Sequence, residues 1–102
     1  MNAFSPKYSW EEDYYCFDFT KQVVVADPIS LAVVTAADSE ENDVTSVLTD
    51  VTLQNITSPK VYSWFRAGTV GETYIMRCRA ITLTGRKLEA EGTLKIKNEG
   101  VI

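Results

Sequence analysis

The clearest pattern in the chain is KLEAEGTLKIK at residues 87–97. Apolar or small residues alternate there with charged or polar ones, which is the period of a strand that buries one face and exposes the other. The pattern therefore predicts a long strand over Lys87–Lys97. Its inward residues are expected to be Leu88, Ala90, Gly92, Leu94 and Ile96.

Two further stretches alternate in the same way, Thr73–Leu83 and Tyr14–Phe19. The first is joined to residues 87–97 by Thr84-Gly85, and these turn residues predict a tight β-connection. Aromatic and β-branched residues favour half-buried strands of this kind. The inward faces are expected to hold Tyr74, Met76, Cys78 and Ala80 in the first stretch and Tyr15, Phe17 and Phe19 in the second.

The remaining strands are shorter or less regular. Apolar, β-rich runs occur at Val23–Val25, Ile29–Thr35, Asp43–Leu53 and Val61–Phe65. Turn-forming and polar residues separate the runs about every ten positions, and no stretch has a convincing helical period. This arrangement predicts an all-β fold, a single immunoglobulin-like antiparallel β-sandwich of about seven strands.

A chain of 102 residues has room for one such domain. Residues 14–98 are expected to form the sandwich, residues 1–13 an extended N-terminal arm, and residues 99–102 a C-terminal tail. The structural core is predicted to contain Tyr15, Phe17, Phe19, Trp64, Tyr74, Met76, Leu88, Leu94 and Ile96.

Tyr74 stands near the start of the penultimate strand, directly after Gly71-Glu72-Thr73. Immunoglobulin-like sandwiches often place a Tyr there whose hydroxyl bonds back to the backbone, the tyrosine corner. Met76 stands two residues on, where antibody domains have a Cys. Tyr74 is therefore either such a corner or an ordinary core aromatic, and the pattern does not choose between them.

The composition argues against several chemistries. The chain has no His, the commonest general base and metal ligand, and its two Cys cannot build a four-thiolate zinc site. The acidic residues of the stretch 38–43 lack the spacing of a calcium-binding loop and are expected to be a solvated loop. We therefore expect no enzymatic activity, no cofactor and no metal.

Charge and hydropathy also limit the partners. A net charge of −4 disfavours non-specific binding of nucleic acid. No apolar run approaches the ~20 residues of a membrane-spanning helix, and residues 1–10 lack the apolar segment of a signal peptide. Neither nucleic acid nor a membrane is expected as a partner.

Cys16 and Cys78 are expected to remain free thiols. Alternation places Cys16 opposite the buried aromatic face of its strand and Cys78 on the buried face of another, whereas a disulfide needs the two Cβ atoms within ~4.5 Å. Cys16 also lacks a His that could activate it. Free thiols predict assembly in a reducing compartment.

Charge is distributed unevenly along the chain. Residues 1–57 carry two cations and ten anions, whereas residues 58–102 carry eight cations and four anions. Either the two halves interleave and neutralise each other across strands, or the molecule has an acidic and a basic side suited to contacts between copies. Interleaving is the more common arrangement in β folds.

Two groups of residues are candidates for protein contacts. The N-terminal arm carries exposed aromatic residues, which are good interface anchors. Arginines follow the strand around Trp64 and line the outer face of the stretch 73–83, either as protein contacts or as cross-strand partners of Glu89 and Glu91. The candidate interface residues are Phe4, Tyr8, Trp10, Arg66, Arg77 and Arg79.

Motifs in a fixed order mark both ends of the chain. The C-terminal half has Trp64, then the turn Gly68-Thr69-Val70-Gly71, Tyr74, a strand reaching Ile81-Thr82, the turn Gly85-Arg86 and the alternating last strand. The N-terminal Tyr15-Cys16-Phe17-Asp18-Phe19 looks like a Tyr-x-Phe-Asp-Trp strand. Together they resemble a family of small tailed-phage virion proteins described as fiber–tail adaptor proteins. The match brackets nearly the whole chain, although residues 22–57 match poorly, Ala67 replaces a turn glycine and Phe19 replaces the family's Trp.

The resemblance implies a non-enzymatic structural subunit of the phage tail or neck. It would be held in a ring of copies around the tail below the portal, where it would join tail fibers to the tail tube. The implied partners are other virion proteins (the tail adaptor or nozzle and the tail fiber) together with copies of the chain itself. The implied location is the virion, after assembly in the host cytoplasm.

Two alternatives to the adaptor remain open at this point. One is a capsid decoration (cement) protein, which is also small, β-rich and non-enzymatic. The other is a carbohydrate-binding module, in which aromatic side chains form a stacking platform. The platform residues would be Tyr8, Trp10, Tyr14 and Tyr62.

Overall fold

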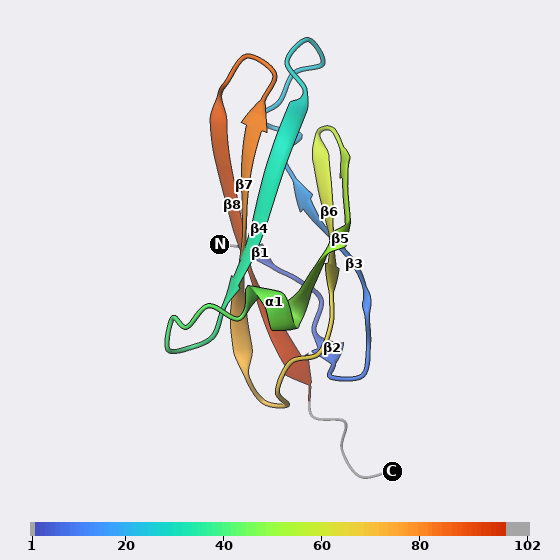
Figure 1. Ribbon diagram of the computed structural model, residues 1–102, viewed down its shortest axis with the longest axis vertical. Coiled ribbons are helices and arrows are strands. Elements are labelled where there is room, and N and C mark those ends of the chain that lie inside the picture. The colour runs from blue at the N-terminus through green and yellow to red at the C-terminus, as the bar shows by residue number, and fades with distance from the viewer. Residues whose placement is uncertain (1, 98–102) are drawn as a thin grey trace.

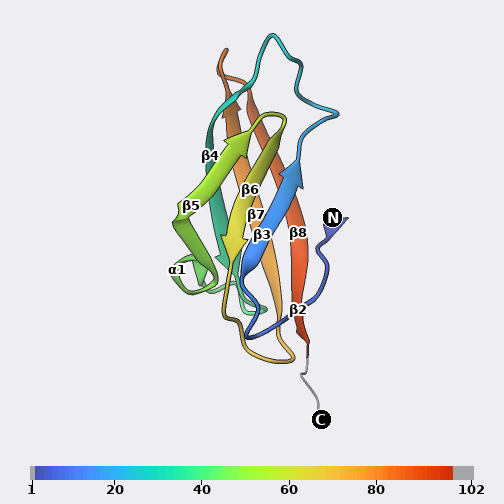
Figure 2. The same ribbon diagram turned by 90° about the vertical axis from the view of Figure 1, so that its right-hand side faces the viewer.

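Two β-sheets pack face to face in the computed structural model, which describes residues 2–97 (Figure 1 and Figure 2). The large sheet has the strand order β1-β8-β7-β4, with β2 also paired to β8, and the small sheet has the order β3-β6-β5. This confirms the predicted all-β sandwich, while the tail expected at residues 99–102 lies outside the described residues. The elements are β1 (Asn2–Ala3), β2 (Lys7–Tyr8), β3 (Asp13–Asp18), β4 (Ile29–Ala37), α1 (Thr45–Leu48), β5 (Thr49–Thr57), β6 (Lys60–Phe65), β7 (Thr73–Thr82) and β8 (Lys87–Lys97).

The core fills the space between the two sheets. It is built by the alternating strands, whose inward residues interdigitate while their outward neighbours stay accessible. Each fully buried large side chain contributes about 1.5–3 kcal/mol relative to an exposed one. Of the residues expected in the core, Phe17, Phe19, Tyr74, Met76, Leu94 and Ile96 are buried, and Tyr15 and Leu88 are partly buried against them.

Trp64 lies outside the core, so its predicted place there is wrong. In β6 the inward residues are Val61, Ser63 and Phe65, and Phe65 is fully buried. Trp64 is half-buried on the outer face, where its ring meets Tyr14 edge-on at a centroid distance of 5.0 Å. The prediction failed because residues 61–65 are apolar on both parities, so alternation alone does not say which set points inward.

The strand predicted at Val23–Val25 is also wrong. Residues 20–27 form turns, in which Gln22 and Val23 donate their N–H groups to the Phe19 carbonyl at 2.9 and 3.0 Å. Val25 is fully exposed. β-branched composition favours a strand, but these turns leave the segment no neighbouring strand with which to pair.

The single strand predicted over Asp43–Leu53 divides into a helical turn and a strand. Asp43 Oδ1 accepts hydrogen bonds from the Thr45 N–H at 3.0 Å and the Thr45 hydroxyl at 2.6 Å, which bends the chain at the start of α1. One turn later Leu48 enters the core and is almost completely buried. Local side-chain bonds of this kind compete with strand formation.

The N-terminal segment pairs with the edge of the large sheet. β1 and β2 run parallel to β8, with Ala3 opposite Thr93 and Lys7 opposite Ile96. Between them, the Phe4 ring lies over Gly92, where a Cβ atom would overlap it. The glycine of the KLEAEGTLKIK pattern thus makes the notch that receives this ring.

β5 is irregular along its outer edge. Asp50 pairs with Trp64 and Asn55 with Tyr62, so residues 51–54 bulge out of the ladder. Asp50 Oδ1 accepts hydrogen bonds from the Thr52 N–H and hydroxyl at 3.0 and 2.6 Å, which stabilises the bulge. Bulges of this kind hinder pairing of an edge strand with another chain.

Candidate functional site

Phe4 is an anchor within the molecule. Its ring makes edge-to-face contacts with Tyr15, Phe17 and Phe65 at centroid distances of 5.8, 5.2 and 5.4 Å. Its backbone N–H donates to the Thr93 carbonyl at 2.9 Å. The side chain expected to bind a neighbouring protein is therefore already occupied in this structure.

Lys7 is fully buried and was not predicted to have a role. Its Nζ donates hydrogen bonds to the carbonyls of Tyr8 at 2.8 Å, Glu11 at 2.9 Å and Ala67 at 2.6 Å, with a longer contact to a fourth carbonyl. Burial lowers the pKa of Lys7, and the carboxylates of Glu11 and Glu12 oppose that shift. The ammonium thus ties the arm to the connection between β6 and β7.

Tyr8 and Trp10 lie on the surface, and Trp10 is the more exposed of the two. The Lys97 ammonium stands 4.1 Å from the centre of the Tyr8 ring, and the Tyr8 N–H donates to Glu11 at 2.6 Å. The Trp10 side chain is 87% exposed. Of the three aromatic candidates in the arm, Trp10 has the most exposed side chain.

The three candidate arginines make contacts within the molecule. Arg77 pairs with Glu91 and Arg79 with Glu89 across β7 and β8, the latter at 2.7 Å. Hydrogen bonding to the Arg79 guanidinium lowers the pKa of Glu89. Arg66 donates to the Ser46 carbonyl at 2.9 Å and also faces Asp50. The pairs of Arg77 and Arg79 with Glu91 and Glu89 form an Arg–Glu ladder, which is the cross-strand pairing given as one alternative for these arginines. Arg79 is still 72% exposed within this ladder.

Aromatic side chains cover part of the outer face of the small sheet. Tyr14 meets Trp64 and Tyr62 edge-on, with interplanar angles of 82° and 84°. The Trp64 indole donates to Glu12 Oε1 at 3.2 Å. Tyr14 is perpendicular to both of the rings it meets, so these three rings do not form one flat row of ring faces.

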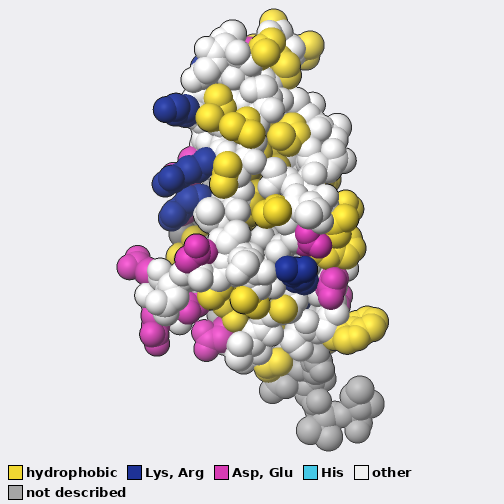
Figure 3. Space-filling model, viewed as in Figure 1, with side chains coloured by type: hydrophobic (Ala, Val, Ile, Leu, Met, Phe, Trp, Pro, Cys, Tyr) yellow, Lys and Arg dark blue, Asp and Glu magenta, His cyan; other side chains and the backbone are white. Residues whose placement is uncertain are grey.

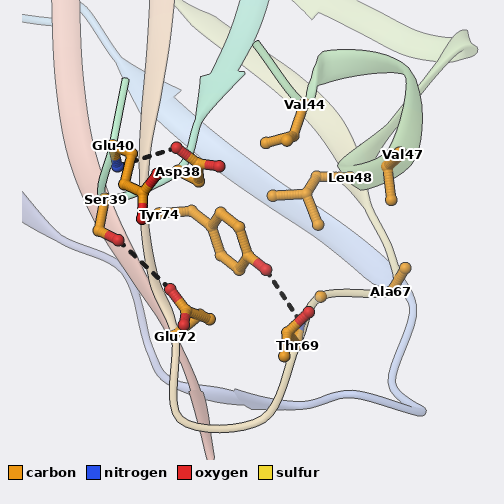
Figure 4. Close-up of a pocket in the computed structure, with 11 residues that line it drawn as sticks. Asp38, Ser39, Glu40, Val44, Val47, Leu48, Ala67, Thr69, Glu72 and Tyr74 are labelled. Atoms are coloured by element: carbon orange, nitrogen blue, oxygen red, sulfur yellow. Dashed lines mark hydrogen bonds between the residues drawn. The ribbon is translucent and has the colours of Figure 1, made fainter. Parts of the chain in front are cut away.

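A cavity of about 540 Å³ opens at the α1 end of the molecule (Figure 4). Its apolar wall comes from α1, the β6–β7 connection and Tyr74, and its rim is acidic. The Tyr74 hydroxyl accepts a hydrogen bond from the Thr69 N–H at 2.9 Å, which is the tyrosine-corner arrangement. On the rim, Ser39 donates to Glu72 at 3.4 Å. The apolar wall is formed by Val44, Val47, Leu48, Ala67 and Tyr74, and the rim carboxylates are Asp38, Glu40 and Glu72.

The two ends of the molecule differ in charge. In Figure 3, Asp and Glu side chains gather around the lower left, below a flank where Lys and Arg side chains gather. That flank includes a shallow hollow of about 590 Å³ over β4, β7 and β8. The acidic and basic halves of the sequence interleave where β4 pairs with β7 and where β3 and β5 pair with β6. The ion pairs Arg66–Asp50 and Arg86–Asp27 also join the two halves.

Nothing in the described part of the chain is arranged for catalysis by an activated thiol or a metal. Cys16 and Cys78 are free, and burial raises the pKa of Cys78 to about 12 and also raises the pKa of Cys16. Among residues 2–97, no three His, Cys, Asp or Glu side chains are grouped as metal ligands. No helix within that range is long and apolar enough to span a membrane.

The fold defines a class of protein, a small all-β sandwich module. Comparison with known families places it more narrowly. The family described as podophage GP4 fiber-tail adaptor protein gp77 matches residues 7–95, and the chain belongs to this family. It is accordingly a phage virion component of the tail-adaptor kind, and a structural family of this kind favours a non-enzymatic role. No curated protein matches the chain.

Proposed function

We propose that this chain joins tail fibers to the tail tube below the portal, in a ring of copies around the tail. The match of the fiber-tail adaptor family over residues 7–95 carries the proposal. The proposed partners are the tail adaptor or nozzle protein and the tail fiber. Assembly in the reducing host cytoplasm agrees with the two free thiols.

The proposed contact with these neighbours is the aromatic side of the small sheet. Tyr14 and Trp64 form its surface. Trp10 lines a hollow together with Glu12, whose carboxylate accepts a hydrogen bond from the Trp64 indole. Trp and Tyr contribute much of the binding energy when an interface buries them. Arg66 directly follows β6 of the small sheet and pairs with Asp50, so we assign it to orientation of this contact through charge. Arg77 and Arg79 point outward from the large sheet, on the opposite side of the sandwich, and remain proposed residues of a contact on that side.

The copy number in purified virions tests the proposed function. Quantitative mass spectrometry against the portal protein is expected to give a value close to that of the portal. A value close to that of the major capsid protein would contradict the adaptor role and indicate a decoration protein. Absence from virions would contradict both, and glycan binding by the isolated chain would then be the next measurement.

Replacement of Trp10 tests the proposed contact. Because Trp10 is 87% exposed, Trp10→Ala is expected to change the free energy of unfolding by less than about 0.5 kcal/mol. If its ring is buried in an interface, the same change weakens binding by about 2 kcal/mol or more, and the protein is depleted from virions. Val33→Ala, at an exposed position on the outer face of β4, is the control. Equal virion content for both variants would contradict the proposed contact.

A further inference from the structure

One end of the molecule carries an apolar knob flanked by cations. The β7–β8 turn exposes Leu83 (69%) next to Arg86 and Lys87, and the neighbouring loop exposes Val24 and Val25. We refer to these five residues as the basic tip. Within residues 2–97, Lys87 has no ion pair, and Arg86 stands 3.9 Å from its one carboxylate neighbour, Asp27.

The basic tip is held rigidly. Asp27 is buried and accepts hydrogen bonds from both the N–H and the hydroxyl of Thr84, each at 2.8 Å. The Leu83 N–H donates to the Pro28 carbonyl at 2.9 Å, which joins the loop to the turn. A surface that is already ordered loses little conformational entropy on binding, so the tip is preorganised to enter a partner.

The opposite end has the complementary chemistry. The cavity beside α1 has an apolar wall that includes Val47 and Leu48, and its rim carries Asp38, Glu40 and Glu72. Asp38 and Glu72 accept hydrogen bonds from neighbouring residues. None of the three rim carboxylates has an ion pair within the described range. An apolar knob flanked by cations matches an apolar cavity with an acidic rim.

The positions of the two surfaces decide what can occupy the cavity. The molecule measures 50 × 26 × 25 Å, and Figure 1 shows the β7–β8 turn at one end of the long axis with α1 and the β4–α1 loop towards the other. A chain therefore cannot place its own tip in its own cavity. A second copy can do so. The resulting assembly still has one free tip at one end and one free cavity at the other, to which further copies can add. Such a heterologous contact forms a ring if the rotation closes and an open chain if it does not.

We propose that copies of this protein contact one another head to tail, with the basic tip of one copy seated in the acidic cavity of the next. Leu83 is the apolar anchor, and Arg86 and Lys87 face Glu40 and Glu72 across the contact. The inference rests on the ring in the proposed function and specifies the surfaces that build it.

Charge reversal on each surface tests the proposal with the purified full chain. By sedimentation equilibrium at low salt, the wild-type chain is expected to self-associate, and to dissociate at about 1 M salt, where the Debye length falls to about 3 Å. R86E/K87E and E40K/E72K are each expected to weaken self-association more than about tenfold, because like charges then face each other. An equimolar mixture of the two variants is expected to recover it, since each reversed surface meets an opposite charge.

A matched pair on one strand separates this contact from an effect of net charge. Lys87→Glu and Lys95→Glu make the same charge change at two exposed positions of β8. Lys95 pairs in register with Thr73, next to Glu72 of the cavity rim. Lys87→Glu is expected to weaken self-association, whereas Lys95→Glu makes the cavity end more acidic and is expected to leave it equal or stronger.

Three results would overturn the proposal. The first is a wild-type chain that remains monomeric at about 1 mM and low salt. The second is a mixture of the two double variants that stays as dissociated as either alone, with both folded by circular dichroism. The third is equal weakening by Lys87→Glu and Lys95→Glu. The copy number in virions distinguishes this proposal from the proposed function. A copy number equal to that of the portal, together with no association between tip and cavity, would support the adaptor role and contradict this contact.

Discussion

The two flanks of the sandwich are closed in different ways. On the β8 flank, a separate segment of chain covers the strand edge and inserts Phe4 and Lys7 into the molecule. On the β4–β5 flank, closure is local, through α1 and a hydrogen bond from Gln54 Nε2 to the Ala32 carbonyl at 2.9 Å. The β8 flank therefore depends mainly on two side chains, Phe4 and Lys7. The β4–β5 flank depends on several weaker interactions along the bulged strand β5.

Removal of the arm is expected to have the largest effect. A chain without residues 1–10 loses the Phe4 contacts and the Lys7 bonds and exposes the β8 edge. We expect the free energy of unfolding to fall by at least about 3 kcal/mol and the protein to aggregate, because an uncovered edge pairs with other chains. Urea unfolding and size-exclusion chromatography measure both effects. Unchanged unfolding would show that the arm is not part of the stable fold.

Lys7→Met is the sharper test of the same flank. Methionine keeps the aliphatic length but leaves the Glu11 and Ala67 carbonyls without their donor, which is expected to cost about 1–3 kcal/mol. Lys95→Met, at an exposed site on β8, is the control and is expected to change stability by less than about 0.5 kcal/mol. Similar unfolding curves for the two variants would contradict a structural role for the buried ammonium.

The contribution of Lys7 to the free energy of unfolding is expected to change with pH in one direction. Burial lowers the pKa of Lys7 in the folded protein, so above this folded pKa and up to the ordinary lysine value of about 10.4 the unfolded chain binds more protons. The contribution of Lys7 to the unfolding free energy therefore rises with pH in this window and is constant below it. The stability difference between wild type and Lys7→Met is expected to grow as the pH rises from the lowered pKa of Lys7 towards the ordinary lysine value. A difference independent of pH would show that Lys7 titrates as an exposed lysine.

On the β4–β5 flank, Gln54→Ala removes one bridging hydrogen bond. Gln54 is half-buried, and its amide is a donor to the Ala32 carbonyl. A loss of about 1 kcal/mol is expected, less than for Lys7→Met, because one neutral hydrogen bond contributes that amount. Urea unfolding again provides the measurement. A loss as large as that of Lys7→Met would show that the two flanks do not differ as described.

Val51→Ala is expected to have the smallest effect. Val51 lies on the β5 bulge and is 66% exposed, so truncation removes little buried surface. The expected change is below about 0.5 kcal/mol, detectable as a shift of the thermal midpoint. A larger loss would indicate that the bulge packs against the sandwich more than its exposure implies.

Much of the architecture follows from alternation in the sequence. The strands β3, β7 and β8 have one polar and one apolar face, so both their type and their inward residues could be predicted. The sequence could not show whether Trp64 points inward or outward, because both alternating sets of residues in VYSWF include large apolar side chains. The turn of α1 was missed because Thr45, Val47 and their neighbours favour strands, and the bonds of Asp43 to Thr45 override that preference.

The surfaces were harder to predict than the fold. Cross-strand pairing of Arg77 and Arg79 was one of two stated alternatives, since charged residues alternate on both β7 and β8. Burial of Lys7 has no signature in the sequence, because the carbonyls that receive it come from residues 8–11 and from Ala67. The acidic cavity likewise requires two loops and α1 to meet, which only the folded chain shows.

The pairing of the arm with β8 also has a consequence for the order in which the protein is made. The arm is synthesised before every other element, yet its partner β8 is the last strand of the domain. During synthesis Phe4 therefore has no Gly92 notch to enter, and the contact closes only after about ninety further residues have been added. The Phe4 ring therefore leaves the ribosome long before the strand that buries it is complete.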